Sequence, residues 1–324
     1  MRRVLSLLLL FALALSVPAL AEEEADERDA ALYAAGLAAL DAAVDGSMTD
    51  VEKLTALHDW LALHCDYGAT KRGETAYGAL VEGTGNCVGY AEGYAYLAAL
   101  AGLDGVTTYS PELDHAWILA TLDGGRYFSD CTWDDGKHVK LGLIRHRYFL
   151  FDELTAASVG HRGWDSAERV PGGALEDVPW ADAVTRVIFE GQYAYFIDGL
   201  FRLCRCDRET WETELLWQTD VRWPDPDPDD NDEPELYTSL MYFGGRLFFN
   251  TPEGIYSVDT GGQEVRTVVE PTLEDGFCIY GAAVRDGMLC YSAADSPDAV
   301  LYDIVPVAPV RTAWGEAEWT FGAE

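Results

Sequence analysis

Cys87 stands between a small glycine-rich loop and a run with helical character, in the stretch GTGNCVGYAEGYAYL. A thiol at the start of a helix faces unpaired backbone N–H groups and the positive end of the helix dipole, both of which favour the thiolate. The same N–H groups can hold an oxyanion. We expect Gly83, Gly85 and Gly89 to leave room for a substrate backbone. Position alone leaves two interpretations open, a catalytic nucleophile and a buried core residue.

A predicted β-hairpin downstream supplies a base and a carboxylate. Asp123 and Gly124 separate HAWILATL from RYFSDCTW, and Asp-Gly between such runs favours a two-residue turn. In that register Trp117 lies opposite Asp130, so His115 and Asp130 are diagonal neighbours on one face. A shift of one residue would place them on opposite faces. A nucleophilic cysteine needs such a base and a group that orients it.

Helices are predicted before the hairpin. Residues 22–45 are rich in Ala and Glu and have helical periodicity. Thr49 and Glu52 form a capping-box pattern, and the helix that follows is expected to end near Gly68. Asn86 is a suitable N-cap for the helix that begins at Cys87. Helices followed by an antiparallel sheet make this half of the chain α+β.

From about residue 183 the chain is nearly all strand and turn. Three segments share one layout of strands and Gly-containing turns: VIFEGQYAYFIDGLFRLCRCD, LMYFGGRLFFNTPEGIYSVD and GAAVRDGMLCYSAADSPDAVLYDI. They recur at roughly 40 to 55 residues, the spacing of propeller blades or β arrays. Because a closed propeller has about four to eight blades, we expect an all-β, propeller-like or open repeat domain. Residues 224–235, PDPDPDDNDEPE, lack the pattern of a calcium loop and are predicted to form a solvated acidic loop.

The motifs GNCVGYAEGYAYLAALAG and DHAWILATLDGGRYFSDCTWDD resemble those of the transglutaminase-like superfamily of papain-like cysteine enzymes. The family pattern is G-x-C-x-G-Y-A at a helix start, then H-A-W, then D-x-T-W-D-D, and all three occur here in that order. The flanking EKLTALHDWLALHCDYG and RYFLFDE resemble bacterial exported members, so the resemblance spans residues 47–165. It implies Cys87 as nucleophile, His115 as base and Asp130 as the group that orients the base.

The resemblance also implies a reaction. The thiolate would attack an amide carbonyl and form a thioester, which water resolves by hydrolysis and a primary amine resolves by acyl transfer. Family members include both peptidases and crosslinking enzymes, and hydrolysis is slightly favoured because an exported enzyme meets far more water than amine. The expected substrate is a protein or peptide, including one on a cell surface. The alternative is a non-catalytic binding or adhesion protein with an inactive transglutaminase-like half.

The N-terminus has the pattern of a secretory signal peptide. A cationic start precedes an apolar run that is too short for a stable membrane span, and ALA at residues 19–21 is a small-x-small cleavage site. An N-terminal anchor helix is the alternative. No later segment is apolar and long enough to cross a membrane, so we expect a secreted protein. The predicted organisation is a signal peptide at 1–21, a catalytic domain at 22–165, a linker at 166–182 and a β-rich domain at 183–324.

Charge and cysteine usage restrict the partners and cofactors. The formal net charge of −34 repels nucleic acid and anionic membranes, so neither is expected as a partner. Seven cysteines leave at least one unpaired, and the cysteines of the predicted β-rich domain could form disulfides: Cys204, Cys206, Cys278 and Cys290. The N-terminal cysteines are too widely spaced for a zinc cluster, and no metal or other cofactor is predicted. No oligomeric state is predicted.

The remaining thiols and imidazoles of this half are predicted to have structural roles. Cys131 follows Asp130 and would alternate to the other face of the strand, as a core residue or half of a disulfide. His58 is expected to be a helix-surface or packing residue. His146 and His161 lie outside the motifs without the spacing of metal ligands.

Overall fold

The computed structural model describes residues 25–136, 141–165, 167–224, 236–285, 288–299 and 305–309 of the 324-residue chain. The predicted signal peptide, and the acidic loop after Pro224, lie outside the described residues. None of the helices within the described ranges combines the length and the apolar character that a membrane crossing requires.

Two helical segments open the described chain. Residues 25–43 are helical, and helix α2 (Asp50–His64) follows with the predicted capping box. The Thr49 side chain accepts a hydrogen bond from the Glu52 N–H, and the Glu52 carboxylate accepts one from the Thr49 N–H. The helix ends earlier than predicted because strand β1 (Asp66–Tyr67) leaves it to pair in parallel with β2 (Thr84–Gly85).

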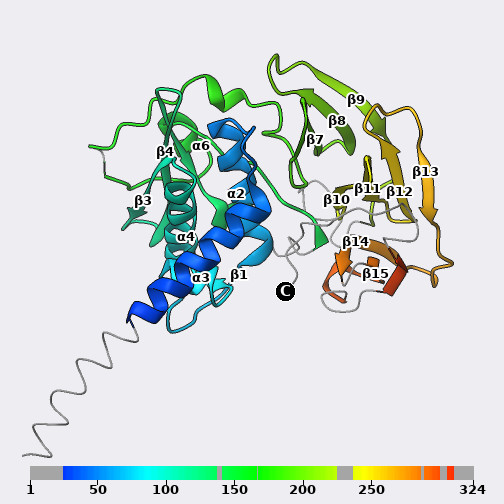
Figure 1. Cartoon of the computed structure of the whole chain (residues 1–324), viewed down its shortest axis with the longest axis horizontal. Helices are drawn as coiled ribbons and strands as arrows, with labels where there is room; N and C mark the ends of the chain where they lie inside the picture. Colours follow the sequence, from blue (N-terminus) through cyan, green and yellow to red (C-terminus); the bar gives the residue numbers. More distant parts are fainter. Residues whose placement is uncertain are drawn as a thin grey trace, which may run out of the picture.

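Helix α4 packs on the central antiparallel sheet, which has the strand order β3-β4-β5. The helix begins at Cys87 after the Asn86 N-cap, as predicted. Figure 1 shows α2 and α4 side by side in the same half of the molecule as this sheet. The bounds of these elements are α3 (Ala76–Leu80), α4 (Cys87–Leu100), β3 (Asp104–Ser110), β4 (His115–Leu122) and β5 (Gly125–Ser129).

The predicted hairpin and its register are confirmed. Asp123 and Gly124 both have positive φ, 48° and 77°, as a two-residue hairpin turn of this type requires. The pairing runs outward from the turn to Ile118 opposite Ser129. This register brings the start of β4 and the end of β5 together at one edge of the sheet.

The strand that was predicted to carry Asp130 ends one residue before it. Asp130 is instead the N-cap of a short helix, α5 (Cys131–Asp134), and its side chain accepts from the N–H groups of Thr132 and Trp133. A carboxylate that satisfies nearby N–H groups competes with continuation of the strand. Cys131 therefore does not alternate across a strand; it is buried in α5, and its thiol donates to the carbonyl of His58 at 3.5 Å.

The β-rich part consists of three antiparallel sheets in which each strand neighbours the next in sequence. None of the sheets in the described ranges closes into a barrel, so the prediction of an α+β core followed by open β repeats is confirmed. Figure 1 shows these sheets beside the helical half. Their strands are β6 (Ile188–Glu190), β7 (Tyr193–Ile197), β8 (Arg202–Asp207) and β9 (Thr213–Gln218); β10 (Leu240–Phe243), β11 (Arg246–Asn250), β12 (Ile255–Asp259) and β13 (Arg266–Val269); β14 (Cys278–Arg285), β15 (Met288–Ala294) and β16 (Val305–Pro309).

One hydrophobic core continues from helix α2 into the first sheet of the β-rich part. Leu57 of α2 and Phe196 of β7 belong to the same buried cluster. Trp180, within the segment predicted as a linker, is fully buried in this cluster, and its indole N–H donates to Thr55 Oγ1 at 3.0 Å. The two halves are therefore packed against each other through apolar side chains, while the predicted domain limits stay a prediction.

All seven cysteines lie in the described residues, and the structure has no disulfide bond among them. The disulfides considered among the cysteines of the β-rich part are therefore absent. The remaining short elements are α6 (Glu153–Ser158) and the 3-10 helices η2 (Ala174–Asp177) and η3 (Pro297–Ala299).

Candidate active site

Cys87 is the first residue of helix α4 and is 7% exposed. The first four N–H groups of a helix have no partner inside it. The Asn86 side chain accepts from Val88 and Gly89, and the Asn86 carbonyl accepts from Tyr90. Among the described residues, the Cys87 N–H has no hydrogen-bond acceptor, so one donor is left beside the thiol.

The glycines near Cys87 serve backbone packing. A Cβ at Gly89 would lie 2.1 Å from the carbonyl oxygen of Gly73, and one at Gly85 would lie 3.4 Å from the same oxygen. That oxygen also accepts a hydrogen bond from the Asn86 N–H at 2.9 Å. The expectation that Gly85 and Gly89 leave room for a substrate is therefore wrong, because the loop around Gly73 fills that space and holds the N-cap.

His115 and Asp130 lie side by side at the edge of the hairpin. His115 Nε2 is 2.7 Å from Asp130 Oδ2, and both side chains are buried. Because Nε2 faces the carboxylate, Nδ1 is the ring nitrogen left for the Cys87 thiol, which is close enough to His115 for each group to shift the pKa of the other. The thiol itself donates to the carbonyl of Asp114 at 3.9 Å. The three residues that the motifs single out are thus neighbours in space, and their catalytic role stays a prediction.

For Cys87, His115 and Asp130, the hydrogen bonds and charges of their neighbours together change the pKa more than burial does. Burial raises the pKa of Cys87, but the hydrogen bond with His115 and two backbone N–H groups lower it below its ordinary value. Burial lowers the pKa of His115, yet hydrogen bonds to Asp130 and Cys87 raise it to about 9. Burial raises the pKa of Asp130, and His115 and His161 bring it below its usual range. The arrangement favours a thiolate beside an imidazolium.

A second histidine, which the sequence did not single out, contacts the same carboxylate. His161 Nε2 is 2.8 Å from Asp130 Oδ2, and its Nδ1 has no hydrogen-bond partner among the described residues. The ring is fully buried between Trp117 and Trp133, with centroid distances of 4.8 Å and 4.2 Å. It comes from the loop after α6, and no spacing pattern links it to the motifs.

Aromatic side chains surround the group. Trp133 stacks on the His115 ring at a centroid distance of 4.8 Å, and Trp117 is 1% exposed. Tyr67 and Tyr109 are exposed and close enough to Cys87 for its charge to contribute to raising the pKa of both hydroxyls, after burial for Tyr67 and after the Asp114 hydrogen bond for Tyr109. The two tyrosines therefore lie on the surface within electrostatic range of the thiol.

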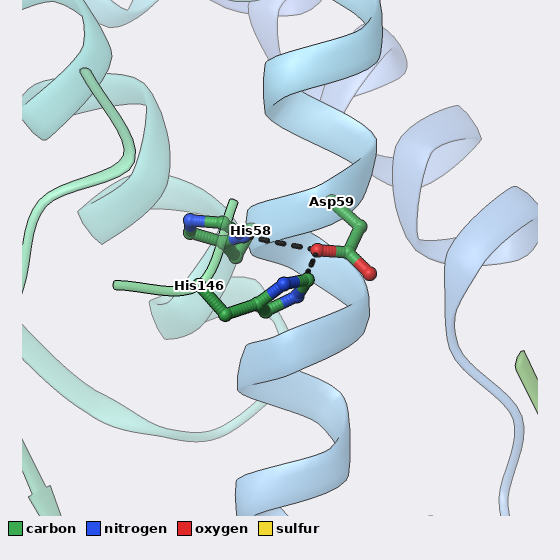
Figure 2. A group of neighbouring side chains, drawn as sticks. All are labelled: His58, Asp59 and His146. Atoms are coloured by element: carbon green, nitrogen blue, oxygen red, sulfur yellow. Dashed lines mark hydrogen bonds and ion pairs between the residues drawn. The ribbon is translucent and has the colours of Figure 1, made fainter. Parts of the chain in front are cut away.

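A separate buried cluster lies on helix α2. Figure 2 shows the rings of His58 and His146 directed at one oxygen of Asp59, with distances of 3.0 Å and 2.8 Å to Oδ1. His58 and His146 are fully buried, so of the two alternatives predicted for His58 the packing residue is the right one. The signal in the sequence was weak: His58 follows Leu54 by one helical turn on the apolar face and is next to an aspartate.

Both histidine clusters have the composition of a metal site. In each, two imidazole nitrogens and one carboxylate oxygen lie within 4.8 Å of one another: His58, Asp59 and His146; His115, Asp130 and His161. Such donors suit zinc. In both clusters, however, the aspartate oxygen already accepts a hydrogen bond from each histidine. We therefore assign these atoms to hydrogen-bond networks.

Comparison with known proteins identifies the first half. Residues 38–129 match the family model described as the transglutaminase-like superfamily. The match covers less than a third of the chain, includes Cys87 and His115, and ends one residue before Asp130. This part of the chain is similar to the transglutaminase-like superfamily, as its motifs predict.

Similarity to solved structures is low. A structure described as a TGase is 16% identical, with a TM-score of 0.29, and the match covers 34% of this chain and 32% of that one. PorZ, a surface component of the type-IX secretion system of Porphyromonas gingivalis, is 13% identical, with a TM-score of 0.24, covering 62% of this chain and 21% of that one. An oligogalacturonate lyase from Vibrio parahaemolyticus is 10% identical, with a TM-score of 0.17, covering 59% and 66%.

This chain thus spans about a third of the first of these structures and about a fifth of the second. At these TM-scores the similarities establish neither an activity nor a substrate. No curated protein matches the chain.

Proposed function

We propose that the protein is a cysteine-dependent amide hydrolase or acyltransferase that acts through Cys87, His115 and Asp130. The observation that carries the proposal is the position of His115, which lies beside the Cys87 thiol and whose Nε2 is 2.7 Å from Asp130 Oδ2. A nucleophile, a base and a group that orients the base are the three parts that covalent amide chemistry requires.

The proposed reaction begins with attack of the Cys87 sulfur on the amide carbon. The carbonyl electron pair moves to oxygen, and the Cys87 N–H, which has no other acceptor in the described residues, donates to that oxyanion. The His115 imidazolium then gives its Nδ1 proton to the departing amine as the C–N bond breaks. A thioester remains on Cys87, and neutral His115 accepts the proton of the next nucleophile.

The acceptor of the acyl group decides between the two reactions. Water would make the protein a peptidase or amidase, and a primary amine would make it a transglutaminase-like crosslinking enzyme. We favour hydrolysis slightly, because the proposed secretion would expose the thioester to far more water than amine. The proposed substrate is a protein or peptide, including one on a cell surface, and the net charge of −34 disfavours nucleic acid as a partner.

Iodoacetamide labelling near neutral pH tests the nucleophile. Cys87→Ser should remove the fast-reacting fraction, because the Cys87 pKa lies below its ordinary value. Cys278→Ser is the matched control: Cys278 is the most exposed of the seven cysteines, and burial raises its pKa. A fast fraction that survives Cys87→Ser would show that the nucleophile is wrongly assigned.

A library of glutamine- and lysine-bearing peptides, analysed by mass spectrometry, tests the reaction. Cleavage, deamidation and isopeptide formation give different mass changes, and each should disappear in Cys87→Ser. If the native protein produces none of the three although Cys87 is reactive, the alternative gains support, namely a binding or adhesion protein with a blocked site.

A further inference from the structure

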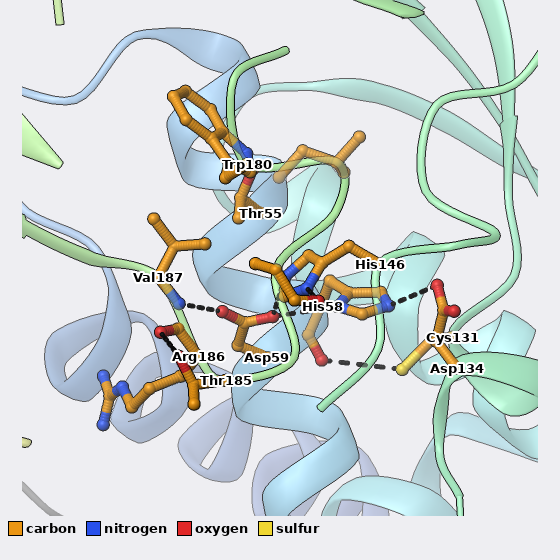
Figure 3. A network of polar contacts seen from close by, with 12 residues as sticks. Thr55, His58, Asp59, Cys131, Asp134, His146, Trp180, Thr185, Arg186 and Val187 are labelled. Carbon is orange, nitrogen blue, oxygen red and sulfur yellow. Dashed lines mark hydrogen bonds and ion pairs between the residues drawn. The ribbon is translucent and has the colours of Figure 1, made fainter. Parts of the chain in front are cut away.

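A buried chain of polar contacts leads from the β-rich part to helix α2. Asp59 Oδ2 accepts a hydrogen bond from the N–H of Val187, just before β6, at 2.8 Å. Asp59 Oδ1 accepts from His58 and His146, and His146 Nδ1 donates to the carbonyl of Ala183 at 3.1 Å. Figure 3 shows Asp59 between Val187 on one side and the two histidines on the other. One carboxylate therefore ties α2 to the segment that enters the first sheet.

His58 extends the chain toward helix α5. Its Nδ1 faces Asp59 and its Nε2 lies 3.2 Å from Asp134 Oδ2, so both ring nitrogens donate to carboxylates. Both can donate only if the ring is an imidazolium. Burial lowers the pKa of His58, but the hydrogen bonds to Asp134 and Asp59 raise it to about 9. His58 is thus a positive charge held between two carboxylates.

Asp134 is linked to Asp130 through the backbone of Tyr148. The Tyr148 N–H is 3.1 Å from both carboxylate oxygens of Asp134, and its carbonyl accepts from the Asp130 N–H at 2.8 Å. The two aspartates are also the N-cap and the last residue of α5. The Cys131 thiol, between them in sequence, donates to the His58 carbonyl. A displacement of Asp134 would therefore move Asp130.

The charges of two further groups bear on the network. Burial lowers the pKa of Arg186, which is close enough to Asp59 for the carboxylate charge to act on it. Burial raises the pKa of Asp134 against the opposing effect of His58. Because the network is buried, water is not available to replace a lost donor or acceptor, and each contact is correspondingly costly to break.

We propose that Asp59 is a positioning residue of the candidate active site. Asp59 holds Asp130 in place against His115 through its contacts with His58 and Asp134. Its contacts with Val187 and His146 make that alignment depend on the docking of the first sheet. This inference rests on the proposed function, because it concerns the alignment of the same three residues. It gives the β-rich part a role in the site in addition to any binding role.

Glu52 provides a matched control on the same helix. It is a buried carboxylate that also bridges α2 to the β-rich part, through Arg208 Nη2 at 2.6 Å. Its other hydrogen bonds are with Thr49 at the start of α2, and its recorded contacts do not extend to α5. Glu52→Gln therefore weakens a contact between the halves without touching the path to Asp130.

The test is the rate of Cys87 alkylation by iodoacetamide from about pH 5 to about pH 9, measured on the Cys87 peptide of folded protein. Asp59→Asn retains only one acceptor oxygen for three donors, so Asp134 and Asp130 should shift and the thiolate should lose support from His115. We expect the midpoint of the profile to rise by about one pH unit, which makes alkylation about tenfold slower at pH values below both midpoints. Glu52→Gln should leave the profile unchanged.

Three results would overturn the inference. They are an Asp59→Asn profile equal to that of the native protein, an equal shift in Glu52→Gln, and an unreactive Cys87 in the native protein. The last result would overturn the proposed function as well, so the two failures are distinguishable. If the Asp59→Asn protein does not fold, the test uses His146→Gln instead, because this substitution removes only one imidazole contact with Asp59. We expect a smaller shift in the same direction, and an unchanged profile overturns the inference.

Discussion

His161 Nε2 lies 2.8 Å from Asp130 Oδ2, the same oxygen that accepts the hydrogen bond from His115. The other oxygen, Oδ1, accepts from two N–H groups of helix α5. Four donors thus fix the plane of one buried carboxylate. Because His115 Nε2 is hydrogen-bonded to this carboxylate, the orientation of the carboxylate also determines the orientation of the His115 ring.

Asp130→Asn should strongly impair the proposed chemistry. The substitution removes the charge that helps to raise the pKa of His115 to about 9, so that pKa should fall toward its ordinary value. An amide also allows the wrong His115 tautomer, and we expect kcat/KM at neutral pH to fall by about a hundredfold or more. His161→Phe keeps a ring among the aromatic neighbours and removes one donor, so its effect should be smaller. Equal kcat/KM for Asp130→Asn and the native protein would contradict this role.

The pH dependence of amide cleavage should be bell-shaped. The thiolate requires the pH to lie above the lowered pKa of Cys87, and the departing amine requires a proton on His115. Activity should therefore rise through the lowered Cys87 pKa and fall as the pH rises through about 9, where His115 loses its proton. The measurement is kcat/KM against pH on a peptide found in the library. A profile that continues to rise well above that pH would exclude His115 as the acid.

Stability should fall on the alkaline side because of His58. Its pKa is about 6.5 in an unfolded chain and about 9 in the folded protein. The folded state therefore holds the proton more tightly, and the stabilisation is complete below the unfolded pKa and is lost as the pH rises through the folded pKa. The loss is on the order of 3 kcal/mol.

Urea unfolding at several pH values measures this loss. Since His115 also has a raised pKa, the native protein must be compared with His58→Gln, in which the alkaline decline of the unfolding free energy should be less steep. An identical decline in both proteins would mean that His58 does not carry its proton as its two carboxylate contacts require.

Gly89→Ala should destabilise the start of helix α4. The added Cβ would lie 2.1 Å from the carbonyl oxygen of Gly73, and this neighbour is backbone, which cannot rotate away. We expect a loss of about 1 to 3 kcal/mol in unfolding free energy, in spite of the better helix propensity of alanine. Gly46→Ala is the control, because no atom lies within 4 Å of its added Cβ. Equal stabilities in urea unfolding would show that the Gly73 loop can move away.

The sequence could predict those features of the fold that residues close together in the chain determine. The Asp123–Gly124 turn and the strands beside it set a register that places His115 near Asp130, and Thr49 marks the start of α2. It could not predict contacts that arise only when distant segments meet. His146 is 87 residues from Asp59 and His161 is 31 residues from Asp130, and neither forms a local pattern with its partner.

The end of β5 was missed for a different reason. Asp130 could continue the strand or cap a helix, and a period-two pattern does not distinguish these two states when the helix is only four residues long. The cap prevails because the carboxylate satisfies two N–H groups of α5 while it also accepts from His115. The same residue therefore ends the strand and holds His115 by a hydrogen bond.

The hydrogen bond between Val187 and Asp59 has a consequence for how the protein matures. The two residues are 128 positions apart, so during synthesis helix α2 leaves the ribosome long before its partner exists. Closing a loop of that length is entropically unfavourable, and such contacts form late in folding. The contact between α2 and the segment that enters the first β-sheet therefore forms only after residue 187 has been made, and the proposed support of Asp130 through Asp59 is complete only from that point.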